Sequence, residues 1–149
     1  MPKVFTSDKQ KIGELGESLA VMFLMKQGFR VIERNYTKKW GEIDIVATKD
    51  NRLYFIEVKS VSHETNSENF DPGAYNVSYE TDNGLDGDNY RPEDNMHPWK
   101  LQRLSRTIQT YLLSKNVSED LEWQLDLFVV KIDMNRKIGR IKIVSDIIL

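Results

Sequence analysis

This chain of 149 residues contains no cysteine, which excludes disulfide bonds, zinc sites built on thiolates and cysteine nucleophiles. It also contains no uninterrupted apolar run that approaches the roughly 20 residues of a membrane-spanning helix. Its start, MPKVFTSDKQKIGELGES, has no apolar stretch of the kind found in a secretory signal, so we expect none. A chain without cysteine fits a reducing compartment, and we expect the protein in the cytoplasm.

Two common kinds of catalytic motif are also missing. The histidines are His63 and His97, and no Ser-His-Asp order with a nucleophile elbow accompanies them. No glycine-rich loop of the P-loop type occurs. We expect His97 to stand at the start of a helix rather than to act as a ligand or a general base. The sequence therefore offers neither a serine-hydrolase triad nor a P-loop nucleotide site.

The composition is that of a globular protein, with 40% hydrophobic and 30% charged residues, and the length predicts one domain over residues 1–149. The net charge of −2 is unevenly distributed. Residues 62–97, the acidic insert, hold nine acidic residues and one basic residue, so they carry −8 and the other residues carry +6. A basic body can hold a phosphate backbone. The aromatic residues of the insert either anchor it on that body or dock a basic partner protein.

Hydrophobic periodicity predicts two helices, one from Ser7 or Asp8 to a C-terminal glycine at Gly28 and one beginning near Pro98. Period-two patterns and bounded apolar runs predict five strands, over residues 29–36, 42–48, 53–60, 122–133 and 138–147. The acidic insert is rich in Gly, Asn, Asp and Pro, and predicts a long loop or a partly disordered flap. This order of elements predicts an α/β fold, with a mixed β-sheet flanked by helices.

Charged residues interrupt the two apolar strands of the segment GEIDIVATKDNRLYFIEVK, residues 41–59. Charge on a packed strand is costly unless it is paired, binds a metal or stays exposed. Because side chains alternate along a strand, Glu42 and Asp44 are predicted to share one face, and Ile43 and Ile45 the other.

The same alternation along the second strand places Glu57 and Lys59 on a common face. If the strands pair as a hairpin, Asp44 and Glu57 converge, and two carboxylates at close range repel each other unless a proton or a cation lies between them. Mg²⁺ takes oxygen ligands and keeps waters for a substrate, so it is the natural cation. Lys59 would then lie beside the metal, able to orient a water or to balance developing charge, and such a set of residues suits metal-assisted phosphodiester hydrolysis. A lone Glu-x-Lys more often reflects salt bridges on an exposed strand, but the complete run favours a site.

The pattern Asp…Glu-x-Lys on adjacent strands, after a helix that carries a glutamate, resembles the PD-(D/E)XK nuclease superfamily, the restriction-endonuclease-like fold. More narrowly, GELGESLAVMFLMKQGFRVIERNY, GEIDIVA, FIEVKS, KLQRLSRTIQTYL and LDLFVV resemble the YraN-like family of predicted endonucleases. The resemblance covers most of residues 10–132, apart from the acidic insert. Val61 departs from the family, which often has a basic residue there. The insert departs as well, since members are generally shorter and an acidic flap repels DNA.

The resemblance implies a role for each matching residue. Asp44, Glu57 and Glu17 would bind the metal, Mg²⁺ or Mn²⁺. Lys59 would be the catalytic lysine, and Lys100 matches a basic position on the second helix near the substrate phosphate. Many related nucleases act as dimers, so the resemblance also implies a homodimer.

Other basic residues are expected to contact the nucleic acid. Arg103 shares a face of the second helix with Lys100, and Lys38 and Lys39 precede Trp40, which either stacks on a nucleobase or caps the strand entrance. Taken together, the sequence predicts a metal-dependent nuclease that hydrolyses phosphodiester bonds in nucleic acid, with DNA as the expected substrate. The alternative is a non-catalytic module of the same fold that binds nucleic acid or protein, which the acidic insert favours.

Overall fold

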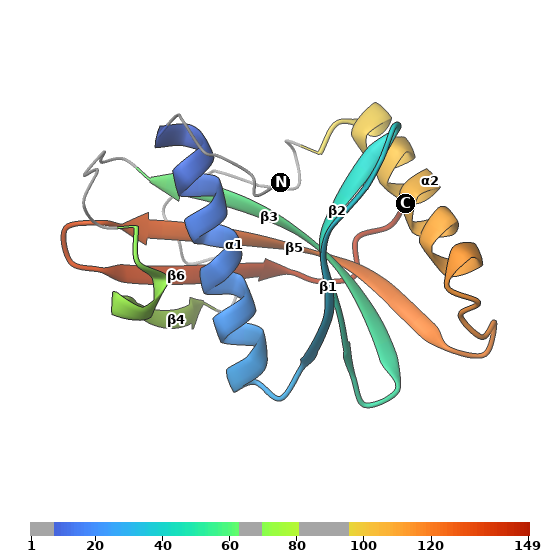
Figure 1. Ribbon diagram of the computed structural model, residues 1–149, viewed down its shortest axis with the longest axis horizontal. Helices are drawn as coiled ribbons and strands as arrows, with labels where there is room; N and C mark the ends of the chain where they lie inside the picture. The colour runs from blue at the N-terminus through green and yellow to red at the C-terminus, as the bar shows by residue number, and fades with distance from the viewer. Residues whose placement is uncertain (1–7, 63–69, 81–95) are drawn as a thin grey trace, which may run out of the picture.

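The computed structural model describes residues 8–62, 70–80 and 96–149, which form a β-sheet with an α-helix on each face (Figure 1). The helices are α1 (Asp8–Lys26), α2 (Pro98–Ser114) and the short 3-10 helix η1 (Pro72–Ala74). The strands are β1 (Arg30–Lys38), β2 (Gly41–Lys49), β3 (Arg52–Ser62), β4 (Asn76–Glu80), β5 (Glu122–Asp133) and β6 (Ile138–Val144). Neither α1 nor α2, the two α-helices of the described residues, is long and apolar enough to span a membrane.

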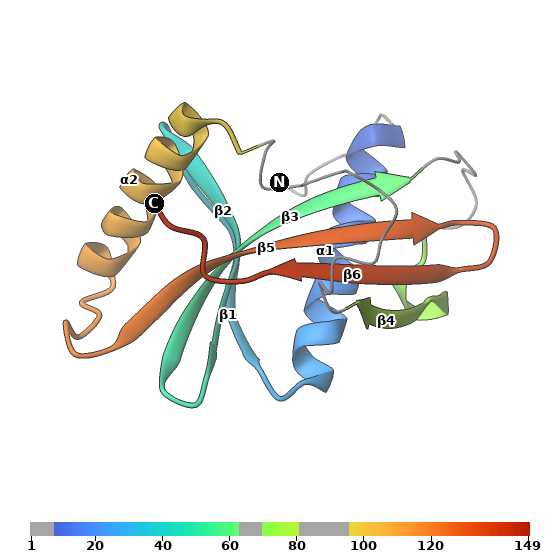
Figure 2. The ribbon, with the colours of Figure 1, turned by 180° about the vertical axis from the view of Figure 1, so that it is seen from behind.

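The sheet is mixed, with the strand order β1-β2-β3-β5-β6-β4. β3 and β5 pair in parallel, as do β4 and β6, while the other neighbours are antiparallel. A parallel pair needs a crossover, and α2 lies in the connection between β3 and β5. α1 crosses in front of β3, β5 and β6 in Figure 1 and behind them in Figure 2. The predicted α/β class is confirmed, and the arrangement agrees with the restriction-endonuclease-like fold.

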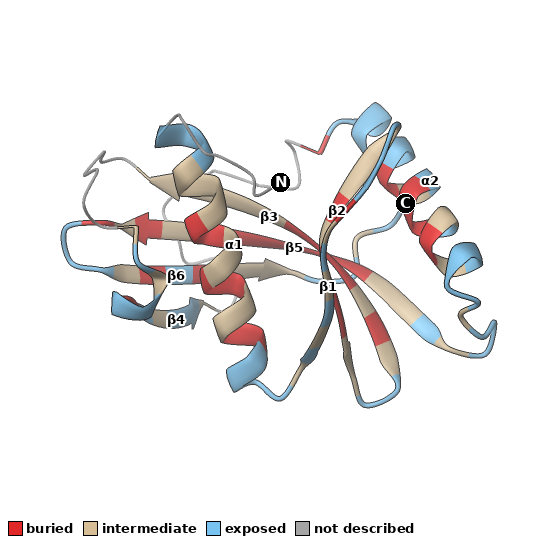
Figure 3. Ribbon diagram, viewed as in Figure 1, coloured by how far each residue is buried: buried red, intermediate tan, exposed pale blue. Residues whose placement is uncertain are grey.

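Two apolar clusters fill the two faces of the sheet. On the α1 side, Leu19 packs with Ile56 of β3, and both are fully buried. On the α2 side, Ile108 packs with Phe55, the neighbour of Ile56 on the same strand. Figure 3 shows the buried residues concentrated along the central strands and in the middle turns of both helices. β3 therefore contributes to both clusters, and its residues lie between the two layers.

The helix boundaries follow the predicted signals. α2 begins at Pro98, and His97 is its N-cap residue, as expected. After α1, Gly28 adopts a φ of 87°, which favours glycine, and the N–H of Phe29 donates to the carbonyl of Leu24 at 2.9 Å. This closure turns the chain directly into β1.

α1 approaches β3 most closely at Gly16. A Cβ atom on this residue would lie 1.8 Å from Ser60 Oγ and 2.8 Å from Ser60 Cβ, so a side chain would force the helix away from the strand. Glycine therefore permits a close contact between the layers. The next residue, Glu17, is held beside the sheet as a consequence.

The prediction of a loop or flap for the whole acidic insert is wrong for its central part. Residues 76–80 form β4, which pairs in parallel with β6 at the edge of the sheet. Tyr75 is buried, and Phe70 and Val77 pack on the α1-side cluster, so spaced apolar residues anchor a polar segment. β6 would otherwise be an edge strand with unpaired backbone groups. The remaining residues of the insert at 63–69 and 81–95, with most of its acidic residues, lie outside the described residues.

Candidate active site

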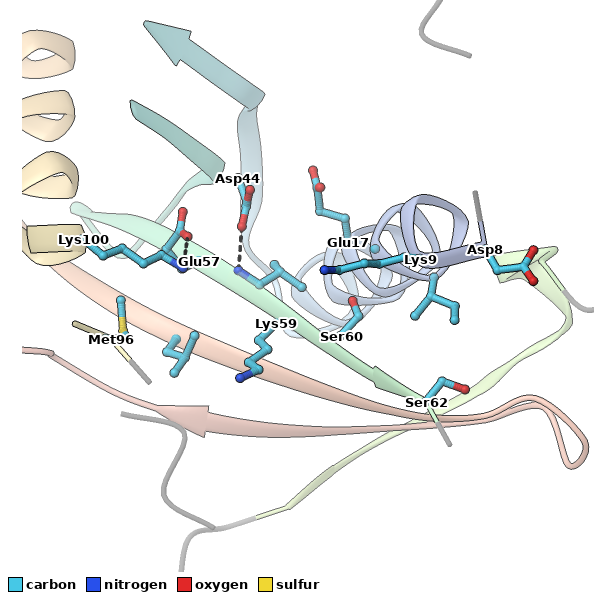
Figure 4. Close-up of a pocket in the computed structure, with 14 residues that line it drawn as sticks. Asp8, Lys9, Glu17, Asp44, Glu57, Lys59, Ser60, Ser62, Met96 and Lys100 are labelled. Atoms are coloured by element: carbon cyan, nitrogen blue, oxygen red, sulfur yellow. Dashed lines mark hydrogen bonds and ion pairs between the residues drawn. The ribbon is translucent and has the colours of Figure 1, made fainter. Parts of the chain in front are cut away.

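β2 and β3 stop pairing at Asp44 and diverge there, which forms a fork between the two strands. The two strands pair from Lys49↔Arg52 to Ile45↔Ile56, and before Ile45 the chain of β2 is paired with β1. At the fork, Asp44 Oδ2 accepts a hydrogen bond of 2.8 Å from the backbone N–H of Val58 (Figure 4). The carboxylate thus satisfies a β3 amide that has lost its strand partner, and this bond fixes Asp44 at the mouth of the fork.

The predicted alternation along β2 fails at the same point. Ile43 belongs to the cluster on the α2 side, whereas Ile45 belongs to the cluster on the α1 side. Residues two apart on a regular strand share a face, so β2 rotates about its own axis across Asp44. Beyond the fork β2 continues with β1 as a two-stranded ribbon, and such ribbons twist more strongly than a wide sheet. Asp44 therefore lies between the two faces instead of on one.

Glu57 is a buried carboxylate on β3, with 8% of its surface exposed. Its Oε2 lies 3.8 Å from Lys100 Nζ, an ion pair without a hydrogen bond. Its Oε1 is buried and finds no hydrogen-bond partner among the described residues. Burial, and then the charge of Asp44, raise the pKa of Glu57 well above its usual value, while Lys100 opposes the shift.

Glu17 approaches the fork from α1. Its side chain is 12% exposed, and Arg34 Nη2 lies 3.8 Å from its Oε1, too far for a hydrogen bond. That oxygen has no hydrogen-bond partner in the described part of the chain. Burial and the charge of Asp44 raise the pKa of Glu17 to about 7, against the opposing charge of Arg34. The charge of Asp44 therefore raises the pKa of both glutamates.

One open pocket of about 660 Å³ is lined by Glu17, Asp44, Glu57 and Lys59, all four residues of the predicted catalytic set. Figure 4 shows the acidic side chains coming from α1, β2 and β3. In the same view, Lys59 extends from β3 in the direction away from Asp44 and Glu57. The structure brings the four residues to one pocket, but the ammonium group does not point at the carboxylates.

A second pocket, of about 520 Å³, adjoins the first and shares Asp44, Glu57 and Lys100 with it. Its lining also includes all of the other basic residues predicted to contact nucleic acid: Lys38, Lys39 and Arg103. The acidic fork therefore adjoins a group of basic side chains, which favours a ligand that carries negative charge.

Trp40, in contrast, is part of the packing. Its side chain is half-buried, its ring lies 4.3 Å from the guanidinium carbon of Arg106, and its indole Nε1 is buried. Its backbone carbonyl accepts a hydrogen bond of 3.0 Å from Arg103 Nε. Of the two predicted roles for Trp40, the structure favours capping of the strand entrance.

The three carboxylates offer a set of ligands suited to a hard divalent cation. All donors are oxygens, and two of the buried oxygens receive no hydrogen bond from the described residues. Within the described residues, no group of three or more Asp, Glu, His or Cys is close enough to hold a metal ion. Each carboxylate instead turns to a partner of its own, Arg34, the Val58 amide or Lys100. Carboxylates repel one another at close range, which agrees with this spread.

Sequence reasoning missed three residues that border the pockets. Lys9, in the first turn of α1, lies between Glu17 and Ser60 in Figure 4. Ser60 has a buried Oγ without a hydrogen-bond partner among the described residues. Trp99, which lines the second pocket, is 53% exposed. The sequence offered two signals, the alternation of side chains along β3 for Ser60 and the position of Trp99 next to Lys100. Only tertiary packing shows that these residues lie near the fork.

The fold and the pocket define a mixed α/β protein of the restriction-endonuclease-like type, with an acidic fork between two strands. The chain belongs to the Uncharacterised protein family UPF0102, whose family model matches residues 16–144. This is the YraN-like family that the motifs resemble. The matched range includes Glu17, Asp44, Glu57, Lys59 and Lys100.

Curated relatives support the same assignment over most of the chain. A UPF0102 protein of Campylobacter jejuni subsp. jejuni is 38% identical over 122 residues, which cover 82% of this chain and 85% of the relative. One from a Sulfurovum species is 36% identical over 134 residues, with 89% and 88% covered. One from Alkaliphilus oremlandii is 33% identical over 128 residues, with 86% and 89% covered.

Proposed function

We propose that this protein is a nuclease that hydrolyses phosphodiester bonds in nucleic acid, with DNA as the first substrate to test and Mg²⁺ or Mn²⁺ as its cofactor. The observation that carries the proposal is the fork at Asp44. There, the largely buried carboxylates of Glu17 and Glu57 share one pocket with Lys59, and this pocket adjoins a second pocket lined by basic residues. Perturbed carboxylates in a cleft are typical of functional sites.

Asp44, Glu57 and Glu17 would hold the cation. When bound there, a divalent cation supplies Lewis-acid activation of the scissile phosphate and a more acidic water. The carboxylates themselves would gain from this, because burial and then the charge of Asp44 raise the pKa values of Glu17 and Glu57, and a cation stabilises the charged form of both. The buried Oε1 atoms would also obtain the polar partner that the described residues do not supply.

Two lysines act on the phosphate and the attacking water in this proposal. Lys100, whose Nζ is 3.8 Å from Glu57 Oε2, is exposed enough to turn to a phosphate once Glu57 has a stronger partner. Lys59 orients the water and balances the charge that develops in the transition state. Its flexible four-carbon stem lets the ammonium turn toward the fork when a phosphate lies there.

The test concerns Lys59. We expect Lys59→Ala to lower the cleavage rate at least about a hundredfold, as for the loss of one preorganised electrostatic group, with a much smaller loss of binding. Lys59→Arg should not restore the rate, because a planar guanidinium does not reproduce a compact ammonium. The measurement uses single-stranded, duplex and branched DNA, and RNA, each with Mg²⁺ and with Mn²⁺. Wild-type protein that binds several of these substrates and cuts none would contradict the proposal.

One observation favours a second function, a non-catalytic module that binds nucleic acid or protein. In Figure 4, Lys59 is directed away from Asp44 and Glu57, which is not the orientation of a lysine poised for catalysis. The acidic insert would then serve as the docking segment for a basic partner protein. A homodimer belongs to the nuclease proposal, because cutting both strands of a duplex needs two active sites. Sedimentation of the protein with and without duplex DNA measures whether such a dimer forms.

A further inference from the structure

Trp99 is an exposed aromatic residue beside the basic residues of the second pocket. It is 53% exposed, whereas Trp40 and Trp123, the other two tryptophans, are half-buried in packing contacts. A single exposed apolar side chain is common and by itself indicates nothing. The surroundings of Trp99 are what distinguish it.

Arg103 holds the indole of Trp99 in a defined position. Its guanidinium carbon lies 5.3 Å from the centre of the Trp99 ring, one helical turn away on α2. The Nε of the same guanidinium donates a hydrogen bond of 3.0 Å to the carbonyl of Trp40, at the turn between β1 and β2. The ring of His97 also contacts the indole, with 5.9 Å between ring centres. The aromatic face is therefore oriented before any ligand binds, which reduces the entropy lost on binding.

The position of Trp99 relates it to the acidic fork. Trp99 lines the same pocket as Asp44 and Glu57, together with Lys38, Lys39, Lys100 and Arg103. Figure 1 shows the first turns of α2 beside the start of β2, and Arg103 bridges these two segments. A strand whose phosphate lies at the fork would thus have a neighbouring nucleotide within the same pocket.

We propose that Trp99 and Arg103 form a stacking platform for an unpaired base next to the scissile phosphate. The inference rests on the proposed function and narrows its substrate to nucleic acid that is single-stranded or splayed at the cleavage site. A base inside a duplex has both faces covered by its neighbours, so only an unstacked base can lie on an indole. The positive charge beside the platform provides for the phosphates that flank such a base.

The experiment measures binding of short fluorescently labelled strands by anisotropy in EDTA, so that cleavage does not intervene. The strands are a DNA single strand, the same sequence as RNA, the DNA duplex, and an abasic strand of equal length with the same number of phosphates. Replacing an aromatic side chain on which a base stacks by alanine typically weakens the affinity for the strand by a factor of about 5 to 150. We expect Trp99→Ala to weaken binding of both base-bearing single strands at least about fivefold, and Trp99→Phe to keep most of the affinity.

Three controls separate stacking from other effects. Trp99→Ala and wild type should bind the abasic strand equally. Tyr79→Ala removes another aromatic residue that is 53% exposed, on β4, and should bind like wild type. The salt dependence of binding should be the same for Trp99→Ala and wild type, because no phosphate contact is lost, whereas Lys39→Ala should reduce the slope by about 0.7 for a single strand.

The outcomes distinguish this inference from the function on which it rests. If wild type binds base-bearing strands but Trp99→Ala binds them as well, or loses affinity for the abasic strand and the duplex in equal measure, the platform is refuted and the nuclease proposal stands. If wild type binds none of the strands, both are refuted. If Trp99→Ala does not fold, the affinities of the wild-type protein for the two kinds of single strand decide. A platform requires the wild type to bind the base-bearing strand at least about fivefold more tightly than the abasic strand, and equal affinities refute it. Equal affinities of wild type for DNA and RNA single strands support a platform that reads the base face only.

Discussion

The two ends of the β2–β3 pair carry charge in opposite ways. At the turn end, Arg52 and Glu122 form an ion pair on the surface, where water solvates both groups. At the open end, Glu57 is 8% exposed, and its basic partner Lys100 is 3.8 Å away. The first arrangement is nearly neutral for stability. The second leaves buried carboxylate oxygens without hydrogen bonds from the described residues, and the raised pKa values of Glu17 and Glu57 record its cost.

The difference shows that burial and geometry, rather than the presence of charge, separate a site from a surface. Both ends hold a basic residue beside a glutamate, Arg52 of β3 with Glu122 of β5 at one end and Lys100 of α2 with Glu57 of β3 at the other. Only at the open end does a strand leave the sheet, and there a side chain, Asp44, replaces a backbone partner. Carboxylates whose pKa values are raised by burial and by a charged neighbour are typical of functional sites.

The largest expected effect comes from Asp44→Asn. Asparagine keeps an oxygen that can accept the hydrogen bond from Val58 but removes the charge. We expect Mn²⁺ binding, measured by calorimetry, to weaken markedly, and cleavage to slow on the order of a thousandfold. Thermal unfolding in EDTA should occur at the same or a higher temperature, since Glu17 and Glu57 lose a repulsive neighbour. Equal Mn²⁺ affinity in the two proteins would show that the fork is not a metal site.

The next effect is a pH dependence of stability due to Glu17. The pKa of Glu17 is about 7 in the folded protein, whereas an unperturbed glutamate has a pKa of 4.5. Between pH 4.5 and 7 the folded state therefore binds more protons than the unfolded state. The free energy of unfolding should therefore fall as pH rises from about 4.5 to 7, by up to about 3 kcal/mol, and then level off. Glu57 acts in the same direction.

Urea denaturation in EDTA from pH 5 to pH 8 checks this dependence. Glu17→Gln should flatten the fall, and Mg²⁺ added at pH 8 should stabilise wild type but not Asp44→Asn. Stability that rises with pH across this range would contradict the argument.

A smaller effect is expected at the contact that holds Glu17 beside the sheet. Gly16→Ala places a methyl group against Ser60, and we expect a loss of roughly 1–3 kcal/mol in the free energy of unfolding, reduced by the better helix propensity of alanine. The double variant Gly16→Ala/Ser60→Gly removes the clash and should recover most of this loss. Chemical denaturation measures both variants, and a double variant no more stable than the single one would show that the contact is not the cause.

The smallest effect is expected at the turn end. Arg52→Ala breaks the exposed pair with Glu122 and should change the free energy of unfolding by less than about 1 kcal/mol, with cleavage unchanged. Assays run beside those of Asp44→Asn make this a matched control on the same hairpin. A large loss of activity in Arg52→Ala would show that the two ends are not independent.

Much of the fold could be predicted from the sequence because its signals are local. The turn at Asp50 and Asn51, both with positive φ, follows from residue types that tolerate that conformation. β4 could not be predicted, since five residues with few apolar side chains become a strand only when β6 offers an edge. The face of Ile43 could not be predicted either, because the rotation of β2 depends on the loss of β3 as a neighbour.

The sequence by itself determined the two α-helices, five of the six strands of the described residues, and the spacing of Asp44, Glu57 and Lys59, because periodicity and turn chemistry act over a few residues. Tertiary structure alone decided that β2 and β3 part at Asp44, that Glu17 meets them across the layer, and that Trp99 shares a pocket with the fork. These relations join residues far apart in the chain. Register, the close contact at Gly16 and the docking of α2 set them, and no short stretch of sequence contains that information.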